Sequence, residues 1–147
     1  MAEYIPSTRD WVAAQVELYE GSQGTEGLTL RDTGFPVIIV TNKGVKTGAI
    51  RKTPLMRVVD GNNYVLVGSL GGAPKHPVWI YNFRANPDVE IRDMTEVQKM
   101  RLREVHDDPE REMLWQAGVK AFPPYEEYKA KTSRKIAIFI AEPIRAE

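Results

Sequence analysis

The segment Lys43–Lys52 gathers cations around a turn, and this composition suits the binding of an anion. Its ten residues include four cations and two glycines. Lysine offers a point charge, whereas arginine offers a planar fork of donors that matches a phosphate or a carboxylate. Glycine also lets the backbone approach a ligand closely. A charged hairpin turn without a ligand would have a similar composition, so both interpretations stay open at this point.

A second candidate is the glycine-rich segment Gly68–Pro77, which leads from an expected strand into an expected helix. The amide donors of such a loop and the N-terminus of the following helix both favour a bound anion. The segment matches neither the dinucleotide-binding motif nor the P-loop. An ordinary strand-to-helix turn is therefore the competing interpretation.

Aromatic and amide side chains form a third candidate. Trp79 has helical spacing with Phe83, which is typical of core residues, and Asn82 lies close to that apolar stripe. A polar side chain there needs a partner, either in the backbone or in a ligand. Tyr125 and Tyr128 are expected either to pack in the core with a solvated hydroxyl or to supply a proton to a reduced product. Because the sequence shows no nucleophile–base pair, the reactive atoms of such an enzyme would belong to a cofactor.

The chain is neutral overall, but its charge is unevenly distributed. Residues 33–87 contain one acidic residue, Asp60, and seven cations, so this stretch carries +6 and the remainder carries −6. The seven cations are Lys43, Lys46, Arg51, Lys52, Arg57, Lys75 and Arg84. A positive zone with acidic flanks favours a small anionic ligand. A nucleic-acid-binding module would show an overall positive excess and an aromatic stacking surface, so no nucleic acid partner is expected.

Composition disfavours several other classes of protein. The chain has no cysteine and its two histidines, His76 and His106, are far apart, so neither a disulfide nor a metal site is expected. No stretch is long and apolar enough to span a membrane, and the N-terminus lacks the features of a signal peptide. A cytoplasmic location is expected, and peripheral association with the inner face of the membrane through the N-terminal helix stays open.

One globular domain is expected, with an N-terminal helix and loop in residues 1–27 and a barrel in residues 28–147. The first expected helix begins after an N-cap at Ser7 and ends at Gly21, and the second begins at Pro77 and is closed by Asn86 and Pro87. A third begins at Asp108 with Met113, Leu114 and Ala117 facing inward, and a further helical turn contains Tyr125 and Tyr128. The expected strands are Pro36–Val40, Ala49–Val59, Asn63–Ser69, one containing Val89 and Ile91, Thr95–Val105 and Ile136–Ile140. About six consecutive strands with hairpin turns and few helices predict an antiparallel, closed or partly closed β-barrel of the α+β class.

These segments together resemble the deazaflavin (coenzyme F420)-dependent nitroreductase family, whose members are split β-barrel flavin and deazaflavin oxidoreductases. The likeness rests on three elements in one order, K-T-G-x-x-R from Lys46, G-G-A-x-K-x-P-x-W from Gly71 and N-x-x-A-N-P from Asn82. The late run FPPYEEYKAKTSRKIAIFIAEP also matches, so the likeness covers nearly all of Pro36–Pro143. It implies a split antiparallel β-barrel with flanking helices that binds coenzyme F420.

The resemblance also implies roles for individual residues. The phosphate and oligoglutamate tail of the coenzyme would be bound by Lys46, Thr47, Arg51 and Lys52. Further contacts with the coenzyme are expected from Gly48, Thr53, Pro54 and Met56. The deazaflavin and its ribityl chain would be lined by Val67, Gly68, Ser69, Gly71, Gly72, Ala73, Pro74 and Lys75, with Trp79 and Asn82 supporting that wall. His76 and Pro77 are further candidates for binding the coenzyme. Tyr125 would close the substrate side, and Tyr125, Tyr128 and Ser69 are the candidate catalytic residues.

The implied reaction is hydride transfer from the reduced coenzyme to a small electron-poor acceptor, such as a quinone, an activated alkene or a nitro compound. Val45 and Leu70 stand where the nitroreductase has arginine and lysine, and the loss of one phosphate contact is expected at Val45. Met56 stands where it has a substrate-side tyrosine, so a more apolar pocket is expected. An FMN-binding flavoprotein on the same barrel is one alternative, although FMN lacks the tail and needs fewer cations. A coenzyme F420 binding or storage protein without turnover is another, and the chain is expected to be a monomer or a homodimer.

Overall fold

The computed structural model describes residues 3–30 and 33–144, and within them the chain forms seven strands, four α-helices and one 3-10 helix. The strands are β1 (Val37–Lys43), β2 (Ile50–Met56), β3 (Val59–Asp60), β4 (Asn63–Val67), β5 (Asp88–Asp93), β6 (Glu96–Glu104) and β7 (Ile138–Pro143). The helices are α1 (Asp10–Gly21), η1 (Leu70–Gly72), α2 (Val78–Ala85), α3 (Asp108–Ala121) and α4 (Pro124–Lys131). In the described part of the chain, no helix is long and apolar enough to cross a membrane.

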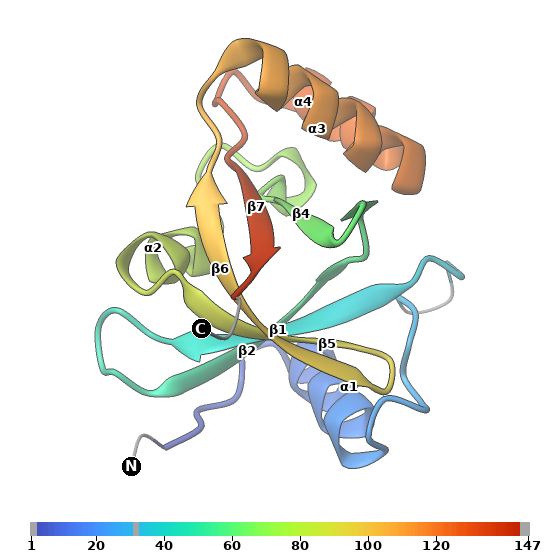
Figure 1. The fold of residues 1–147 in the computed structure, drawn as a ribbon, viewed down its shortest axis with the longest axis vertical. Helices are drawn as coiled ribbons and strands as arrows, with labels where there is room; N and C mark the ends of the chain where they lie inside the picture. The colour runs from blue at the N-terminus through green and yellow to red at the C-terminus, as the bar shows by residue number, and fades with distance from the viewer. Residues whose placement is uncertain (1–2, 31–32, 145–147) are drawn as a thin grey trace.

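All strands join one curled sheet in the order β2-β1-β5-β6-β7-β4-β3, and every pairing is antiparallel (Figure 1). The predicted antiparallel barrel is therefore confirmed, although with seven strands instead of about six. The difference arises in Ala49–Val59, which divides because β2 pairs with β1 while β3 pairs with β4. Pro54 lies on β2 at the edge of the sheet, where a residue without an amide donor is tolerated.

Strand β1 is buried on both faces, which explains its continuous apolar sequence. Ile38 and Val40 point into the barrel interior, and α2 packs there through Ile80 and Phe83. On the opposite face of β1, Val37 and Ile39 pack against Val16 and Tyr19 of α1. Alternating side chains of one strand thus serve two separate cores.

The helix α1 is attached to the sheet through Tyr19. Its hydroxyl donates a hydrogen bond to the Val37 carbonyl at 3.1 Å and accepts one from the Met94 amide at 2.7 Å. The expected cap was wrong, because Arg9 is the N-cap residue and the Ser7 hydroxyl accepts a hydrogen bond from the Arg9 amide instead. The boundary expected after residue 27 stays a prediction.

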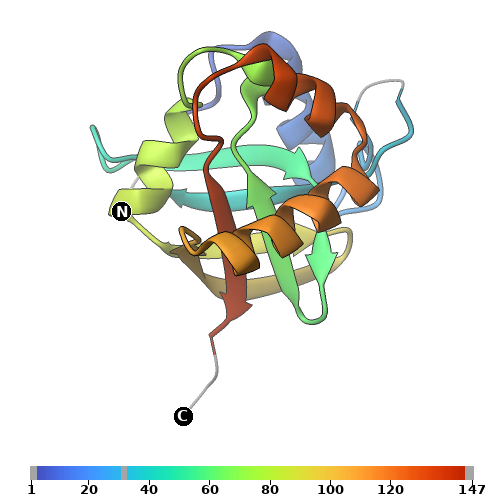
Figure 2. The same ribbon diagram turned by 90° about the horizontal axis from the view of Figure 1, so that it is seen from above.

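The helices α3 and α4 cover the outer face of β4 and β7, and Figure 2 shows α3 lying across both strands. Leu114 and Trp115 of α3 are buried there, as are Phe122, the C-cap residue of α3, and Tyr125 in the first turn of α4. The expectation that Met113 faces inward was wrong, since this side chain is 59% exposed. The buried stripe of α3 runs through Leu114, Trp115 and Gly118, and it leaves Met113 on the solvent side.

Candidate active site

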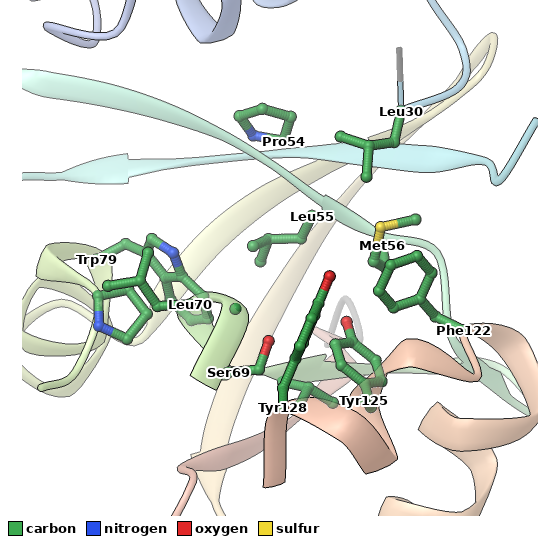
Figure 3. A pocket seen from close by; sticks show the side chains of 13 residues that line it. Leu30, Pro54, Leu55, Met56, Ser69, Leu70, Trp79, Phe122, Tyr125 and Tyr128 are labelled. Carbon is green, nitrogen blue, oxygen red and sulfur yellow. The ribbon is translucent and has the colours of Figure 1, made fainter. Parts of the chain in front are cut away.

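A pocket of about 180 Å³ lies between β2, the loop after β4, α2 and α4 (Figure 3). Its lining is largely apolar and consists of Leu30, Pro54, Leu55, Met56, Val67, Ser69, Leu70, Gly71, Pro77, Trp79, Phe122, Tyr125 and Tyr128. The chain brings these residues together from five separate segments. Met56 contributes to the apolar surface, as the sequence predicted, and Leu70 does so as well.

Three hydroxyl groups interrupt this apolar lining. Ser69, Tyr125 and Tyr128 direct their hydroxyls into the pocket from the side opposite β2 (Figure 3). Within residues 3–30 and 33–144, no protein group forms a hydrogen bond with any of the three. The three hydroxyl oxygens are not fully buried but open onto the pocket, so they are available to a ligand.

Tyr125 is 4% exposed, and its environment determines its protonation. Burial raises the pKa of Tyr125 far above its ordinary value, and the neighbouring Tyr128 adds to the rise. The phenol therefore keeps its proton at neutral pH. It can donate a hydrogen bond or a proton, but it does not act as a phenolate base.

The loop after β4 has a backbone shape that depends on glycine. Leu70, Gly71 and Gly72 follow one another with φ angles of 44°, 61° and 82°. A Cβ atom on Gly72 would lie 2.6 Å from the Tyr128 carbonyl oxygen, so α4 approaches the loop as closely as it does only because this residue is glycine. The loop and α4 therefore form adjoining walls of the pocket.

The cationic turn is attached to α2, the helix that carries Trp79 into the pocket. Asn82 accepts a hydrogen bond through Oδ1 from the Val45 amide at 2.9 Å. The Asn86 side-chain amide donates to the Lys43 carbonyl at 3.1 Å. The sequence left open whether Asn82 binds backbone or ligand, and the structure shows that its oxygen binds backbone.

The cations of residues 33–87 fall into two groups. Three of them form ion pairs, namely Lys52 with Glu20, Arg57 with Asp93 and Arg84 with Glu104. In the part of the chain that the structure describes, the other four have no ion pair, and they are Lys43, Lys46, Arg51 and Lys75. Of the cations expected to bind the tail, Lys46 and Arg51 are thus available, whereas Lys52 already has a carboxylate partner.

The structure brings together nine of the twenty-two predicted site residues in the pocket lining, namely Pro54, Met56, Val67, Ser69, Gly71, Pro77, Trp79, Tyr125 and Tyr128. The others lie outside the lining: Lys46, Thr47, Gly48, Arg51, Lys52 and Thr53 on the turn and β2, Gly68, Gly72, Ala73, Pro74, Lys75 and His76 in the loop, and Asn82 on α2. In the described part of the chain, no group of three or more histidine or acidic side chains could hold a metal ion.

Several pocket residues were missed by the sequence reasoning. Leu30, Leu55 and Phe122 line the pocket without having been predicted to do so. Phe122 could have been found, because it begins the late run that carried part of the resemblance. Arg134, in the same run, lies behind the glycine-rich loop and donates hydrogen bonds to its carbonyl groups. A lone arginine between polar residues has no periodic pattern that would have indicated this role.

Comparison with known proteins agrees with this geometry. The family model described as F420H(2)-dependent quinone reductase matches residues 11–143. An F420H(2)-dependent quinone reductase of Mycobacterium tuberculosis is 33% identical over 125 residues, which cover 84% of this chain and 83% of that protein. A solved structure of an F420-H2 dependent reductase (FDR-A) has a TM-score of 0.68 and 44% identity, and the match covers 73% of this chain and 94% of that one. A solved domain-swapped dimer has a TM-score of 0.71 and 42% identity, with 92% of this chain and 100% of that chain covered.

Proposed function

The chain belongs to the F420H(2)-dependent quinone reductase family, and from this premise we propose that it passes a hydride from reduced coenzyme F420 to a quinone in the apolar pocket. The resemblance to F420-dependent reductases seen in the sequence is confirmed, and coenzyme F420 is the cofactor of this family. One observation carries the proposal. The apolar pocket contains three hydroxyls that have no hydrogen-bond partner among the described residues. It also borders β2, the strand that leads to Lys46 and Arg51, which form no ion pair with a described residue.

The residues present fit a ligand with a planar ring at one end and a polyanionic tail at the other. Leu55 in the pocket and Arg51 near the turn lie on the same face of β2, four residues apart, which corresponds to about 13 Å along a strand. Beside Gly71, a Cβ atom would meet no atom within 4 Å, so open space adjoins the backbone of the pocket wall. We assign the ring of the coenzyme to the pocket, and its phosphate and glutamate tail to Lys46 and Arg51.

When bound, coenzyme F420 supplies a hydride from the ring carbon that replaces the reactive nitrogen of a flavin. The contribution of the chain is to orient the reactants and to exclude water, and orientation of this kind is worth ~7–11 kcal/mol in model reactions. Reduction of a quinone to a hydroquinone takes up one hydride and one proton. The phenol of Tyr125 keeps its proton and can donate a hydrogen bond to the acceptor oxygen, although its raised pKa makes it a weaker acid. The proton comes from a tyrosine of the pocket or from solvent. Ser69 offers a further donor on the same side of the pocket.

The lining favours an apolar acceptor. Met56, Leu30 and Phe122 present carbon and sulfur to the pocket and no charged group. A quinone, whose two oxygens are its only polar atoms, therefore fits better than an acceptor that carries charge. Activated alkenes and nitro compounds stay candidate acceptors, and storage of the coenzyme without turnover stays the alternative from another class.

A related chain forms a domain-swapped dimer, which supports a homodimer for this protein. Light scattering of the purified protein over a range of concentrations would distinguish it from a monomer. The expected cytoplasmic location, with or without peripheral association at the membrane, stays a prediction from the sequence.

The test is titration of the purified protein with oxidised coenzyme F420 and, in parallel, with FMN, at low and high salt. We expect binding of the deazaflavin that weakens with salt and with removal of the glutamate tail, because surface charges are screened. The reduced coenzyme is then mixed with quinones, activated alkenes and nitro compounds. Oxidation of the reduced coenzyme by a quinone, but not by the other acceptors, supports the proposal. Binding without oxidation by any acceptor would favour a storage protein, and binding of FMN alone would overturn the cofactor assignment.

A further inference from the structure

The side chain of Arg134 uses all its donors on the loop that forms one wall of the pocket. Nε donates to the Ala73 carbonyl at 3.1 Å, and Nη2 donates to the carbonyls of Ala73 at 2.9 Å and Ser69 at 2.8 Å. Nη1 donates to the Gly68 carbonyl at 3.0 Å and lies 3.3 Å from Nδ1 of His76. A guanidinium has five N–H donors, and the loop therefore engages every one of them.

These acceptors lie on both ends of the loop. Gly68 and Ser69 are on the segment that leaves β4, whereas Ala73 and His76 are on the segment that leads into α2. Arg134 therefore holds the two ends of the loop together around the backbone of residues 70–72, where all three φ angles are positive. Such a conformation is costly for Leu70, which has a side chain, and it persists only where surrounding contacts enforce it.

Arg134 does not serve as the partner of an acidic residue. Within the described residues it forms no ion pair, and its hydrogen-bond acceptors are three main-chain carbonyls and one histidine ring. Burial lowers the pKa of its guanidinium from the ordinary value. Arginine stays protonated nonetheless, so His76 must accept through an unprotonated Nδ1. The position thus requires a planar group with donors in several directions, which lysine does not provide.

The loop that Arg134 holds contributes Ser69, Leu70 and Gly71 to the pocket lining, whereas Arg134 itself does not line the pocket. We propose that Arg134 is a positioning residue, which fixes the Ser69 hydroxyl and the backbone of residues 70–71 against the ring of the bound coenzyme. This inference rests on the proposed function for the identity of the ligand. The geometry of the loop itself does not depend on that identity.

The variants Arg134→Lys and Arg134→Ala test the proposal, with Arg101→Lys and Arg101→Ala as matched controls. Arg101 is an exposed arginine that pairs with Asp88 on the β5–β6 hairpin, and it does not line the pocket. Hydrogen exchange without coenzyme comes first. We expect the amides of Gly72 and Ala73, which donate within the loop, to exchange about tenfold faster in Arg134→Lys, since one or two hydrogen bonds are lost. Core amides such as that of Val65 should be unchanged, as should every loop amide in the Arg101 variants.

Function is measured on the same proteins. In Arg134→Lys we expect the coenzyme Kd to rise about tenfold, and a double-mutant cycle with Ser69→Ala to give effects on hydride transfer that are not additive, because contacting residues are coupled. Added guanidinium ion at a concentration that leaves the wild type folded should partly restore Arg134→Ala. An Arg134→Lys variant in which the amides of the loop exchange at the wild-type rate would overturn the proposal. Equal acceleration of exchange at all amides would also overturn it, because that result indicates general destabilisation. If the wild type binds no coenzyme F420, the proposed function fails while the exchange experiment still decides whether Arg134 holds the loop.

Discussion

Asn82 and Val45 join the pocket to the cationic turn through one hydrogen bond, in which the Val45 amide donates to Asn82 Oδ1 at 2.9 Å. Asn82 is 7% exposed and belongs to the same helix as Trp79, which lines the pocket. The turn that carries Lys46 is therefore fixed in position relative to the wall of the pocket. A ligand that spans both would meet a preformed surface, which lowers the entropic cost of binding.

We predict that Asn82→Ala lowers the free energy of unfolding by about 1–3 kcal/mol, because the Val45 amide loses its acceptor in a partly buried position. Coenzyme affinity should fall as well, with a weaker dependence on salt. Asn86→Ala is the matched control, since its side-chain bond to the Lys43 carbonyl is exposed. Urea unfolding and coenzyme titration measure both effects, and an equal loss in the two variants would argue against a special role for Asn82.

The structure separates two neighbouring cations that the sequence treated alike. Arg51 has no ion pair with a described residue, whereas Lys52 pairs with Glu20 of α1. We predict that Arg51→Ala raises the coenzyme Kd by about tenfold, the scale of one charge-assisted contact, and leaves hydride transfer at saturation nearly unchanged. Lys52→Ala should have the smaller effect on affinity. The assignment of the tail to this turn would not survive an Arg51 variant with wild-type affinity.

Tyr125→Phe tests the source of the proton. Because no described residue bonds to the hydroxyl, we expect no loss of stability, which thermal unfolding would check. Turnover with a quinone at saturation should fall by about 10²-fold or more, the usual contribution of a general acid. Tyr128→Phe is the comparison variant. A larger loss in Tyr128→Phe would transfer the role of proton donor to that residue.

His76 makes stability depend on pH through its contact with Arg134. Burial, followed by the charges of Arg134 and Arg84, lowers the pKa of His76 below the ordinary 6.5, while Glu104 opposes this shift. As the pH falls, the unfolded chain therefore takes up the proton before the folded chain does. The contribution of His76 to the free energy of unfolding is fully present above pH 6.5, and it is lost as the pH falls from 6.5 through the lower pKa of the folded state.

We therefore expect the free energy of unfolding of the wild type to fall more steeply than that of His76→Gln as the pH is lowered from about 8 to about 5. Glutamine does not titrate and can still offer an oxygen to the Arg134 guanidinium. Urea unfolding at several pH values measures the difference in slope. Identical slopes in the two proteins would contradict the contact that we describe.

The sequence predicted most of the elements because their signals are local. The apolar run Pro36–Val40 predicts one strand, and the alternation of apolar and polar residues around Val89 and Ile91 predicts another. The order of the strands is a long-range property, since β4 pairs with β7, more than seventy residues later. The division of Ala49–Val59 into β2 and β3 also depends on which partner strand each half meets, and no local pattern contains that information.

The candidate site shows the same limit. Ser69, Trp79 and Tyr125 were predicted from their types and from the resemblance, and the fold brings all three to one pocket. The pairing of Lys52 with Glu20 joins residues 32 positions apart and was not foreseen. Arg134 was missed for a related reason, since its main-chain acceptors lie 61 to 66 positions away and main-chain carbonyls carry no sequence signal.

Adjacent glycines in the loop allow the last prediction to separate backbone strain from steric contact. Gly71 and Gly72 both have positive φ angles, of 61° and 82°. A Cβ on Gly71 would meet nothing within 4 Å, whereas one on Gly72 would lie 2.6 Å from the Tyr128 carbonyl oxygen and 3.0 Å from Lys131 Cβ. Both alanine variants therefore share the strain of a left-handed residue, which costs about 1–2 kcal/mol. The Gly72 variant must in addition displace the backbone of α4.

We predict that Gly71→Ala loses about 1–2 kcal/mol of unfolding free energy, the cost of a left-handed alanine, and that Gly72→Ala loses clearly more. Because α4 carries both tyrosines, Gly72→Ala should also reduce turnover at saturating coenzyme, by displacing their hydroxyls from the pocket. Urea unfolding gives the difference in stability, and steady-state kinetics with a quinone gives the effect on turnover. Equal stability of the two variants would mean that α4 shifts at no cost, and the close approach of loop and helix would then have no part in shaping the pocket.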